Sequence, residues 1–184
     1  MIPPQDEVPR TLHLLRHAKS SWREGGLDDR DRPLNARGHR AGRLVAAYLA
    51  RQPAPGLVLC SSARRARETW DHVARALAAP PPASVEDALY LATARAVMER
   101  IAAVPDDIAT LLVIGHNPGL HELAAALARH GAHHDRARLA AKFPTAALAS
   151  FRLAGPWRAI AHAPIALTGY VVPGDLDETA GDLD

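Results

Sequence analysis

Thr110-Leu111-Leu112-Val113-Ile114-Gly115-His116-Asn117-Pro118 is the stretch that decides the fold class. Its first five residues form an apolar run, which predicts a strand covered on both faces, as in a parallel sheet. The run breaks at Gly115, and Asn117 and Pro118 suit the N-cap and the first turn of a helix over residues 120–127. A buried strand that leads directly into an amphipathic helix is typical of α/β proteins.

The same pattern occurs twice upstream. An apolar strand at residues 11–15 precedes a helix that Asn35 caps, and a strand at 56–60 precedes a helix that Ser61 or Ser62 caps. The remaining expected elements are an extended piece at 84–85, a helix at 94–101, and strands at 147–153 and 157–162. Alternating strands and helices predict a three-layer α/β/α sandwich around a mostly parallel central sheet.

Length and composition indicate a single domain. The chain has 184 residues, of which 48% are hydrophobic and 23% charged, so it can bury a real core and is neither disordered nor fibrous. We find no internal repeat or linker, and we expect residues 1–184 to form one domain. Residues 1–9 are expected to be a peripheral leader. Residues 173–184 carry five acids and no base, which predicts a peripheral mobile tail or a surface wrap.

The single cysteine and the lack of a targeting pattern indicate the compartment. Cys60 lies in an apolar run, where a buried, inert thiol is expected, and one cysteine excludes an internal disulfide. Residues 1–9 do not resemble a secretory signal, and no apolar run approaches the roughly 18 residues of a membrane span. We therefore expect a cytoplasmic protein with no membrane partner. The oligomeric state is left open.

Arginine dominates the positive charge. The chain has 22 Lys+Arg against 20 Asp+Glu, and only Lys19 and Lys142 are lysines. This skew reflects either codon bias or recognition of oxyanions. A nucleic-acid-binding module would show a basic stripe interleaved with aromatic residues. Aromatic residues make up only 4% of the chain, and the arginines are spread from Arg10 to Arg158, so we expect no nucleic-acid partner.

Three polar segments follow the expected strands, namely Arg16-His17, Ser61 to Arg67, and His116-Asn117-Pro118. The carboxyl ends of parallel strands meet at one edge of a sheet, so these segments should surround one crevice. Arg64, Arg65 and Arg67 crowd the positive end of the second helix, which is unfavourable without an anion and well suited to one. The alternative is a solvated basic helix start on an arginine-rich surface.

Four short segments resemble one family. Leu15 to Trp22 resembles the arginine-histidine-glycine signature of the histidine phosphatase superfamily, with Ala18 in the glycine position. Ser61 to Thr69 and Gly115 to Gly119 are similar to its second and third motifs. Asp31 to Gly38 resembles the segment that follows the nucleophile in SixA-type phosphohistidine phosphatases. The resemblance, in the family's order, implies branch 1 of the superfamily and a phosphoglycerate-mutase-like fold.

The resemblance also implies a site. His17 would be the nucleophile, and Arg16, Arg65 and His116 would hold the phosphoryl oxygens without a metal or another cofactor. Ser20 and Arg23 would be further substrate contacts, although many relatives have asparagine at the position of Arg23. Whether Arg64 or Arg65 points into the pocket is open.

The segment after the second motif departs from the family pattern. Glu86 and Asp87 occur there without the glycine-rich, tryptophan-containing context in which many relatives place a general acid. A phosphorus–nitrogen bond to imidazole needs less acid assistance than an alkyl phosphate. We therefore favour hydrolysis of phosphohistidine in proteins. The alternative is a general phosphomonoesterase acting on small phosphate esters, with Glu86 or Asp87 as the acid.

A second group of polar residues has a metal-like composition. It comprises His130, His133, His134 and Asp135, and a solvated helix exit is the favoured interpretation, so no metal site is assigned. Trp22 and Tyr90 are expected to line the crevice or to pack beside it. Asp28 and Asp31 either hold the loop arginines Arg30 and Arg32 or are simply solvated.

Overall fold

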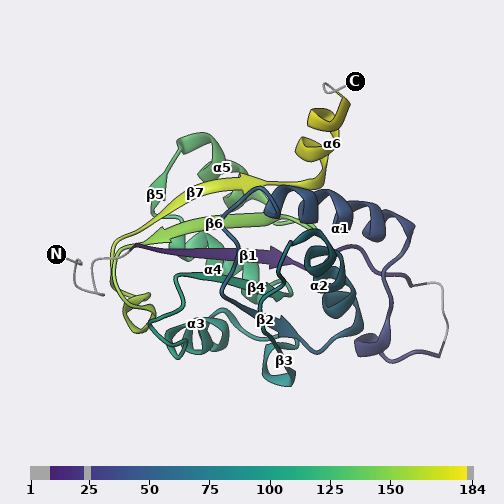
Figure 1. Cartoon of the computed structure of the whole chain (residues 1–184), viewed down its shortest axis with the longest axis horizontal. Helices are drawn as coiled ribbons and strands as arrows, with labels where there is room; N and C mark the ends of the chain where they lie inside the picture. The colour runs from purple at the N-terminus through teal and green to yellow at the C-terminus, as the bar shows by residue number, and fades with distance from the viewer. Residues whose placement is uncertain (1–8, 23–25, 182–184) are drawn as a thin grey trace.

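The computed structural model describes residues 9–22 and 26–181, which form one twisted sheet with helices on both faces (Figure 1). The strands are β1 Arg10–Arg16, β2 Leu57–Ser61, β3 Ala83–Glu86, β4 Thr110–Gly115, β5 His130–Gly131, β6 Leu148–Leu153 and β7 Ile165–Val171. The helices are α1 Ala36–Leu49, α2 Arg64–Ala76, α3 Ala94–Ala102, α4 Gly119–Leu127, α5 His133–Ala141 and α6 Pro173–Gly181. Short 3₁₀ turns are η2 Asp29–Asp31, η3 Asp87–Leu89 and η4 Trp157–Ala159.

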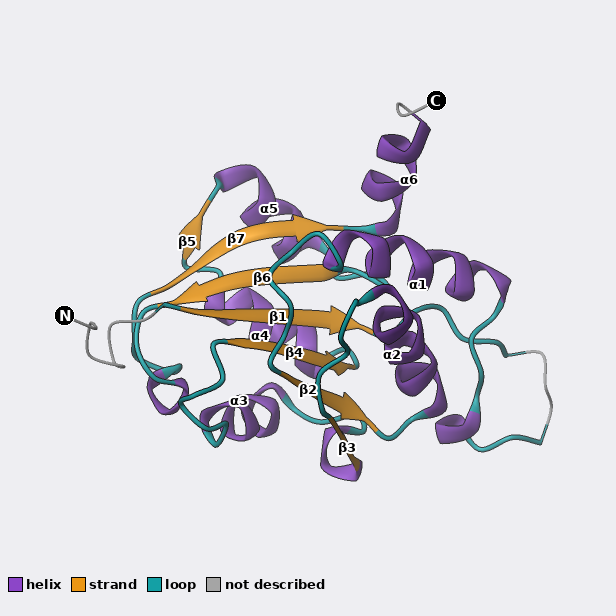
Figure 2. Ribbon diagram, viewed as in Figure 1, coloured by secondary structure: helices purple, strands orange, loops and turns teal. Residues whose placement is uncertain are grey.

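The strand order is β3-β2-β4-β1-β6-β7-β5. The first four strands in this order run parallel to one another, β6 is antiparallel to β1 and β7, and β5 is parallel to β7. The predicted three-layer α/β/α sandwich with a mostly parallel sheet is confirmed, as the ribbon view shows (Figure 2).

Two apolar clusters lie on opposite faces of the sheet. One packs the inner faces of α1 and α2 against the sheet and includes Val45, Leu49 and Val73. The other packs α3, α4 and α5 against the opposite face and includes Ile101 and Leu123. Every residue of β4 is buried, as its apolar run predicts for a strand covered on both sides.

The carboxyl ends of β1, β2 and β4 lie side by side. Arg16 pairs with Gly115, and Cys60 pairs with Ile114, so the residues that follow each strand emerge at one edge. The expectation that the three polar segments surround one crevice is thereby confirmed for the backbone. The same edge receives the amino ends of α2 and α4.

The prediction of a strand at residues 157–162 is wrong. Residues Trp157–Ala159 form the 3₁₀ turn η4, and the last strand is β7, at 165–171. Trp157 is fully buried, and its indole Nε1 donates to the Ile108 carbonyl at 2.7 Å. The apolar residues of this segment are thus buried from a 3₁₀ turn and not from a strand.

The described part of the acidic C-terminal segment forms the helix α6. Asp177 of α6 forms an ion pair with Arg40 of α1, and Asp175 forms one with Arg138 of α5. Leu176 packs against the apolar cluster beneath α1. Opposite charges on two neighbouring helices therefore hold α6 against the body of the protein.

Two of the three expected N-caps are wrong. Asn35 caps α1, since its Oδ1 accepts a hydrogen bond from the Gly38 amide at 2.9 Å. The N-cap of α2 is Ala63 and that of α4 is Pro118, neither of which makes a side-chain cap bond. Ser61 and Asn117 instead turn their side chains to other partners, which are described below.

The polar group after α4 is not a helix exit. His130 lies in the short strand β5, and His133, His134 and Asp135 begin α5. The three histidines are exposed to solvent. No helix among the described residues is long and apolar enough to cross a membrane.

Candidate active site

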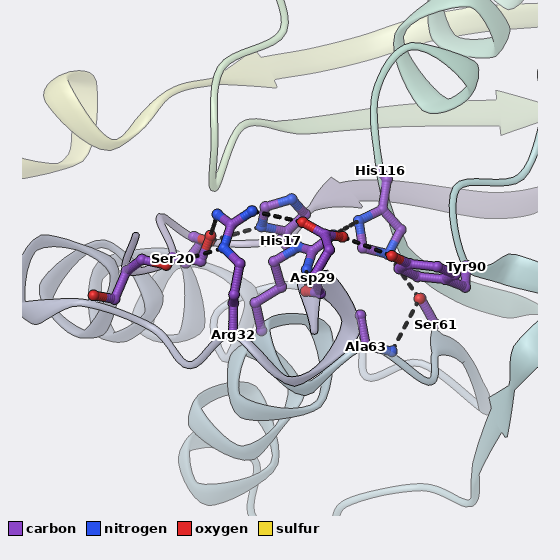
Figure 3. A network of polar contacts seen from close by, with 11 residues as sticks. His17, Ser20, Asp29, Arg32, Ser61, Ala63, Tyr90 and His116 are labelled. Carbon is purple, nitrogen blue, oxygen red and sulfur yellow. Dashed lines mark hydrogen bonds and ion pairs between the residues drawn. The ribbon is translucent and has the colours of Figure 1, made fainter. Parts of the chain in front are cut away.

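A pocket of about 370 Å³ opens at the carboxyl edge of β1 and β4. It is lined by Arg16, His17, Lys19, Ser20, Trp22, Asp29, Arg32, Arg65, Leu91, His116, Asn117 and Thr145. The structure thus brings together the four residues expected to carry the chemistry, which are Arg16, His17, Arg65 and His116. The rings of His17 and His116 lie near each other, with Asp29 close by (Figure 3).

His17 is held as a neutral ring with one defined tautomer. Its Nδ1 lies 2.7 Å from the Ala18 carbonyl, which can only accept a hydrogen bond, so Nδ1 carries the proton and Nε2 keeps its electron pair. Burial lowers the pKa of His17 to about 3, and the Ala18 bond opposes this shift. The nearby charge of Arg65 lowers the pKa further. An unprotonated imidazole nitrogen is therefore available at neutral pH.

His116 lies beside His17, with the two ring centroids 4.9 Å apart. Its Nε2 is 2.7 Å from the hydroxyl of Ser61, and its Nδ1 faces Nη2 of Arg65 at 3.5 Å. Because a guanidinium only donates, Nδ1 is the acceptor in this state. Burial, followed by the charge of Arg65, lowers the pKa of His116 to about 4.

Arg65, and not Arg64, points into the pocket. The Arg65 side chain is 4% exposed, whereas Arg64 is 45% exposed and pairs with Glu68 one turn further along α2. Thr69 links this part of α2 to the nucleophile loop. Its hydroxyl donates to the Arg65 carbonyl at 2.6 Å and accepts from the Ala18 amide at 3.0 Å. The second motif therefore ends in a residue that ties Arg65 to the His17 loop.

Asp29 is a pocket residue that the sequence interpretation missed. Its Oδ2 accepts from Arg65 Nη2 at 2.9 Å and from the Tyr90 hydroxyl at 2.6 Å, and its Oδ1 accepts from Arg32 Nη1 at 2.6 Å. The hydrogen bond from Tyr90 is the main cause that lowers the pKa of Asp29 to about 2, and the bond from Arg65 adds to it. Of the two alternatives for Asp28 and Asp31, the solvated one agrees with the structure, because both residues are exposed. Asp29 pairs with Arg32 instead.

Arg16 and Asn117 share an anchor beside the pocket. Nη1 of Arg16 and Nδ2 of Asn117 each donate to the Phe143 carbonyl at 2.9 Å. Arg16 Nε and Asn117 Oδ1 are buried with no partner among the described residues. Burial, followed by the charge of Arg65, lowers the pKa of the Arg16 guanidinium. Two guanidinium groups thus face one pocket, which favours an anion between them.

The loop after His17 forms the rim. Ser20 is buried and accepts a hydrogen bond from Arg32, whose guanidinium lies 3.2 Å from the ring centroid of Trp22. Trp22 is 79% exposed, so it lines the mouth rather than packing inside. A Cβ on Gly38 would lie 2.0 Å from the Lys19 carbonyl, so only glycine lets α1 approach this loop. Arg23, the other expected substrate contact, lies outside the described residues.

Glu86 and Asp87 do not line the pocket. Both oxygens of Glu86 accept from Arg100 of α3, at 2.8 to 3.0 Å. Asp87 is 74% exposed and pairs with Arg30 at 2.9 Å. Tyr90, from the same segment, does contact the site, with its ring edge-on to His116 and the two ring centroids 5.6 Å apart. Within the described ranges, no three histidine, cysteine or acidic side chains converge in a way that would hold a metal ion.

Fold and pocket together define an α/β protein with a histidine-centred anion pocket at the carboxyl edge of its sheet. Residues 12–90 match the histidine phosphatase superfamily (branch 1). An uncharacterized protein of Mycobacterium tuberculosis strain H37Rv is 41% identical over 163 residues, which cover 86% of this chain and 99% of the relative. A candidate phosphohistidine phosphatase SixA of Agrobacterium tumefaciens has 30% identity and a TM-score of 0.75, and the match covers 90% and 99% of the two chains.

The tungstate complex of the protein histidine phosphatase SixA is similar as well, with 25% identity, a TM-score of 0.73, and coverage of 90% and 99%. This chain belongs to branch 1 of the histidine phosphatase superfamily. The predicted family is confirmed, and the family and its structural neighbours support phosphatase activity.

Proposed function

We propose that this protein hydrolyses phosphohistidine in proteins, through a covalent phosphohistidine intermediate on His17. The observation that carries the proposal is the orientation of His17. A neutral ring keeps its Nε2 electron pair free while its Nδ1 is tied to the Ala18 carbonyl, in a pocket that also contains Arg16 and Arg65. The similarity to SixA structures supports the same substrate class.

Two displacements at phosphorus complete the reaction. In the first, Nε2 of His17 attacks the phosphorus atom, and the electron pair of the broken phosphorus–nitrogen bond returns to the substrate imidazole. A phosphoimidazole that is protonated on its other nitrogen leaves as neutral imidazole. In the second, water attacks the phosphorus, the bond to Nε2 breaks, and the water proton passes to solvent or to the released phosphate. His17 is regenerated in its starting tautomer.

Arg16 and Arg65 are placed to stabilise the oxygens of the phosphoryl group. Their guanidinium groups are fixed by the Phe143 carbonyl and by Asp29, so little reorganisation is needed when charge develops. Removing one such donor typically costs about 10²–10³ in rate. His116 joins them once an anion is present, because an anion beside Nδ1 favours the protonated ring, which then donates from Nδ1.

The acid inventory of the pocket favours a phosphorus–nitrogen bond over an alkyl ester. Asp29 is the one carboxylate among the described residues that line the pocket. With a pKa of about 2 it is ionised at neutral pH and has no proton to give to an alkoxide. Glu86 and Asp87, the acids of the alternative phosphomonoesterase, point elsewhere. Imidazole is a leaving group that needs no such donor.

The test compares leaving groups on one enzyme. A histidine-containing peptide, phosphorylated with potassium phosphoramidate, and an alkyl phosphate of similar size are followed by ³¹P NMR. We expect kcat/KM for the phosphohistidine peptide to exceed that for the ester by about 10² or more, since the ester lacks an acid catalyst. His17→Ala should abolish both activities, while His162→Ala, at an exposed position, should retain them. Unchanged hydrolysis by His17→Ala, or faster hydrolysis of the ester, would overturn the proposal.

A further inference from the structure

A second hollow adjoins the active-site pocket. It has a volume of about 430 Å³ and lies between α1 and the start of α6. Lys19 and Thr145 line both this hollow and the pocket around His17, so the two hollows are direct neighbours. We call the second hollow the basic groove. Its lining comprises Lys19, Arg37, Arg40, Ala41, Leu44, Thr145, Pro173, Gly174 and Asp177.

The groove has an excess of positive charge. Three of its lining residues are cations, and Asp177 is the one acidic residue among them. Lys19 and Arg37 are exposed, and neither forms an ion pair with another residue in the described ranges. Like charges that share a groove without counter-ions repel one another, so the groove is suited to an acidic ligand.

Arg40 already shows which chemical group the groove accepts. Its Nη2 holds both carboxylate oxygens of Asp177, at 2.7 and 2.8 Å, although the Arg40 side chain is 66% exposed. The carboxylate comes from α6, so a residue of this chain already forms an ion pair with one of the three cations. The lining also includes Ala41 and Leu44 of α1, whose apolar side chains suit the aliphatic carbons of a peptide.

We propose that the basic groove binds acidic residues that flank the phosphorylated side chain of a substrate protein. The inference rests on the proposed function, because it assigns the groove to the same substrate that places its phosphoryl group at His17. An extended peptide advances about 3.3 Å per residue, so residues a few positions from the phosphohistidine would reach across Lys19 into the groove. Asp177 competes for the same cations, and releasing Arg40 from it strengthens binding.

Two phosphohistidine peptides test the proposal. They are identical except that three residues on each side of the histidine are Asp or Glu in one and Ser or Gln in the other. With the unmodified protein, kcat/KM for the acidic peptide should exceed that for the neutral peptide by about 5- to 10-fold, through KM, and the ratio should shrink as salt is raised.

Two variants should move this ratio in opposite directions. Arg37→Glu should reduce it to about one, and Asp177→Asn should increase it about twofold by freeing Arg40. Arg43→Glu makes the same charge change on an exposed residue of the same helix that does not line the groove, and it should leave the ratio unchanged. A ratio near one in the unmodified protein, or an equal loss in Arg37→Glu and Arg43→Glu, would overturn the proposal.

Binding separates this inference from the proposed function. Fluorescence anisotropy of both labelled peptides with the His17→Ala variant measures the groove without turnover. If the unmodified protein hydrolyses neither peptide, but the acidic peptide binds more tightly and Arg37→Glu removes this preference, the proposed function fails and the groove proposal stands. If the unmodified protein hydrolyses both peptides equally and the two peptides bind equally, the proposed function stands and the groove proposal fails. Arg37-dependent binding of a single-stranded RNA in place of either peptide would also overturn the inference.

Discussion

Asp29 accepts hydrogen bonds from both terminal nitrogens of the Arg65 guanidinium. Oδ2 accepts from Nη2 at 2.9 Å, and the Asp29 carbonyl accepts from Nη1, so both ends of the guanidinium fork bond to one residue. These bonds fix the orientation of Arg65. They also pair its guanidinium with the negative charge of Asp29 before any substrate binds. A phosphoryl group that enters the pocket must share Arg65 with this carboxylate or displace it. Asp29 therefore orders Arg65 and, at the same time, opposes the binding of an anion.

Asp29→Asn separates these two effects. We expect inorganic phosphate to inhibit the variant about 3- to 10-fold more strongly, because one negative charge beside the bound anion is lost. We also expect kcat to fall by about 10-fold, since an amide holds Arg65 less firmly than a carboxylate does. Steady-state kinetics with phosphate as a competitive inhibitor measure both. Asp31→Asn, an exposed carboxylate on the same 3₁₀ turn, should change neither value. Weaker inhibition of Asp29→Asn would contradict the competition described above.

Ser61 controls the orientation of His116. Its hydroxyl is 2.7 Å from Nε2, and replacing it with alanine should leave the ring without its partner and lower kcat by about 10-fold. In the unmodified protein, adding tungstate should raise the pKa of His116 from about 4 towards neutrality, which ¹H–¹⁵N NMR of the imidazole would report. Ser62→Ala removes a neighbouring hydroxyl that has no partner among the described residues and should leave both readouts unchanged. Full activity in Ser61→Ala would show that this bond is not needed.

Thr69 connects the nucleophile loop to α2. Thr69→Val keeps the shape of the side chain but removes both hydrogen bonds, leaving the Ala18 amide without its acceptor. We expect a loss of about 1–3 kcal/mol in the free energy of unfolding, together with a fall in kcat, because the peptide unit beside His17 is no longer fixed. Thr69→Ser retains the hydroxyl and should restore most of the activity. Chemical denaturation and kinetics of both variants provide the measurement, and a serine variant as impaired as the valine variant would argue against the hydrogen bonds.

The elements that the sequence predicted best are those whose pattern has a single physical cause. The apolar run at 110–114 and its turn into a helix require burial on both faces, and β4 is buried throughout. The parallel order then brings the ends of β1, β2 and β4 together without any knowledge of side-chain packing. For this reason Arg16, His17, Arg65 and His116 meet in one pocket as expected.

What the sequence could not predict depends on contacts between residues distant in the chain. The loop at residues 28–31 has three aspartates, and the local sequence does not distinguish among them. The 3₁₀ turn places Asp29 against Arg65, which lies 36 positions away in the chain. The strand expected at 157–162 has the right apolar content, but Trp157 is buried in the apolar core from a 3₁₀ turn, with its indole bonded to the Ile108 carbonyl. The bond between Ser61 and His116 spans 55 positions and carries no local signal except a serine at the end of a strand.

His13 predicts how stability depends on acid. It lies in β1, 2% exposed, with Nδ1 2.8 Å from the Ser150 hydroxyl, and burial lowers its pKa from 6.5 to about 4. The unfolded chain therefore binds a proton on His13 below about pH 6.5, whereas the folded protein does not until about pH 4.

The contribution of His13 is fully present above pH 6.5 and is lost as the pH falls towards 4, by about 3 kcal/mol in total. His13→Asn keeps a polar group towards Ser150 but does not titrate. Its free energy of unfolding should fall less steeply between pH 7 and pH 4.5 than that of the unmodified protein, while His17 and His116 maintain part of the slope. Urea denaturation at several pH values measures this, with His162→Asn as the exposed control. Parallel pH profiles for His13→Asn and the unmodified protein would show that His13 binds its proton at the same pH in the folded and unfolded states.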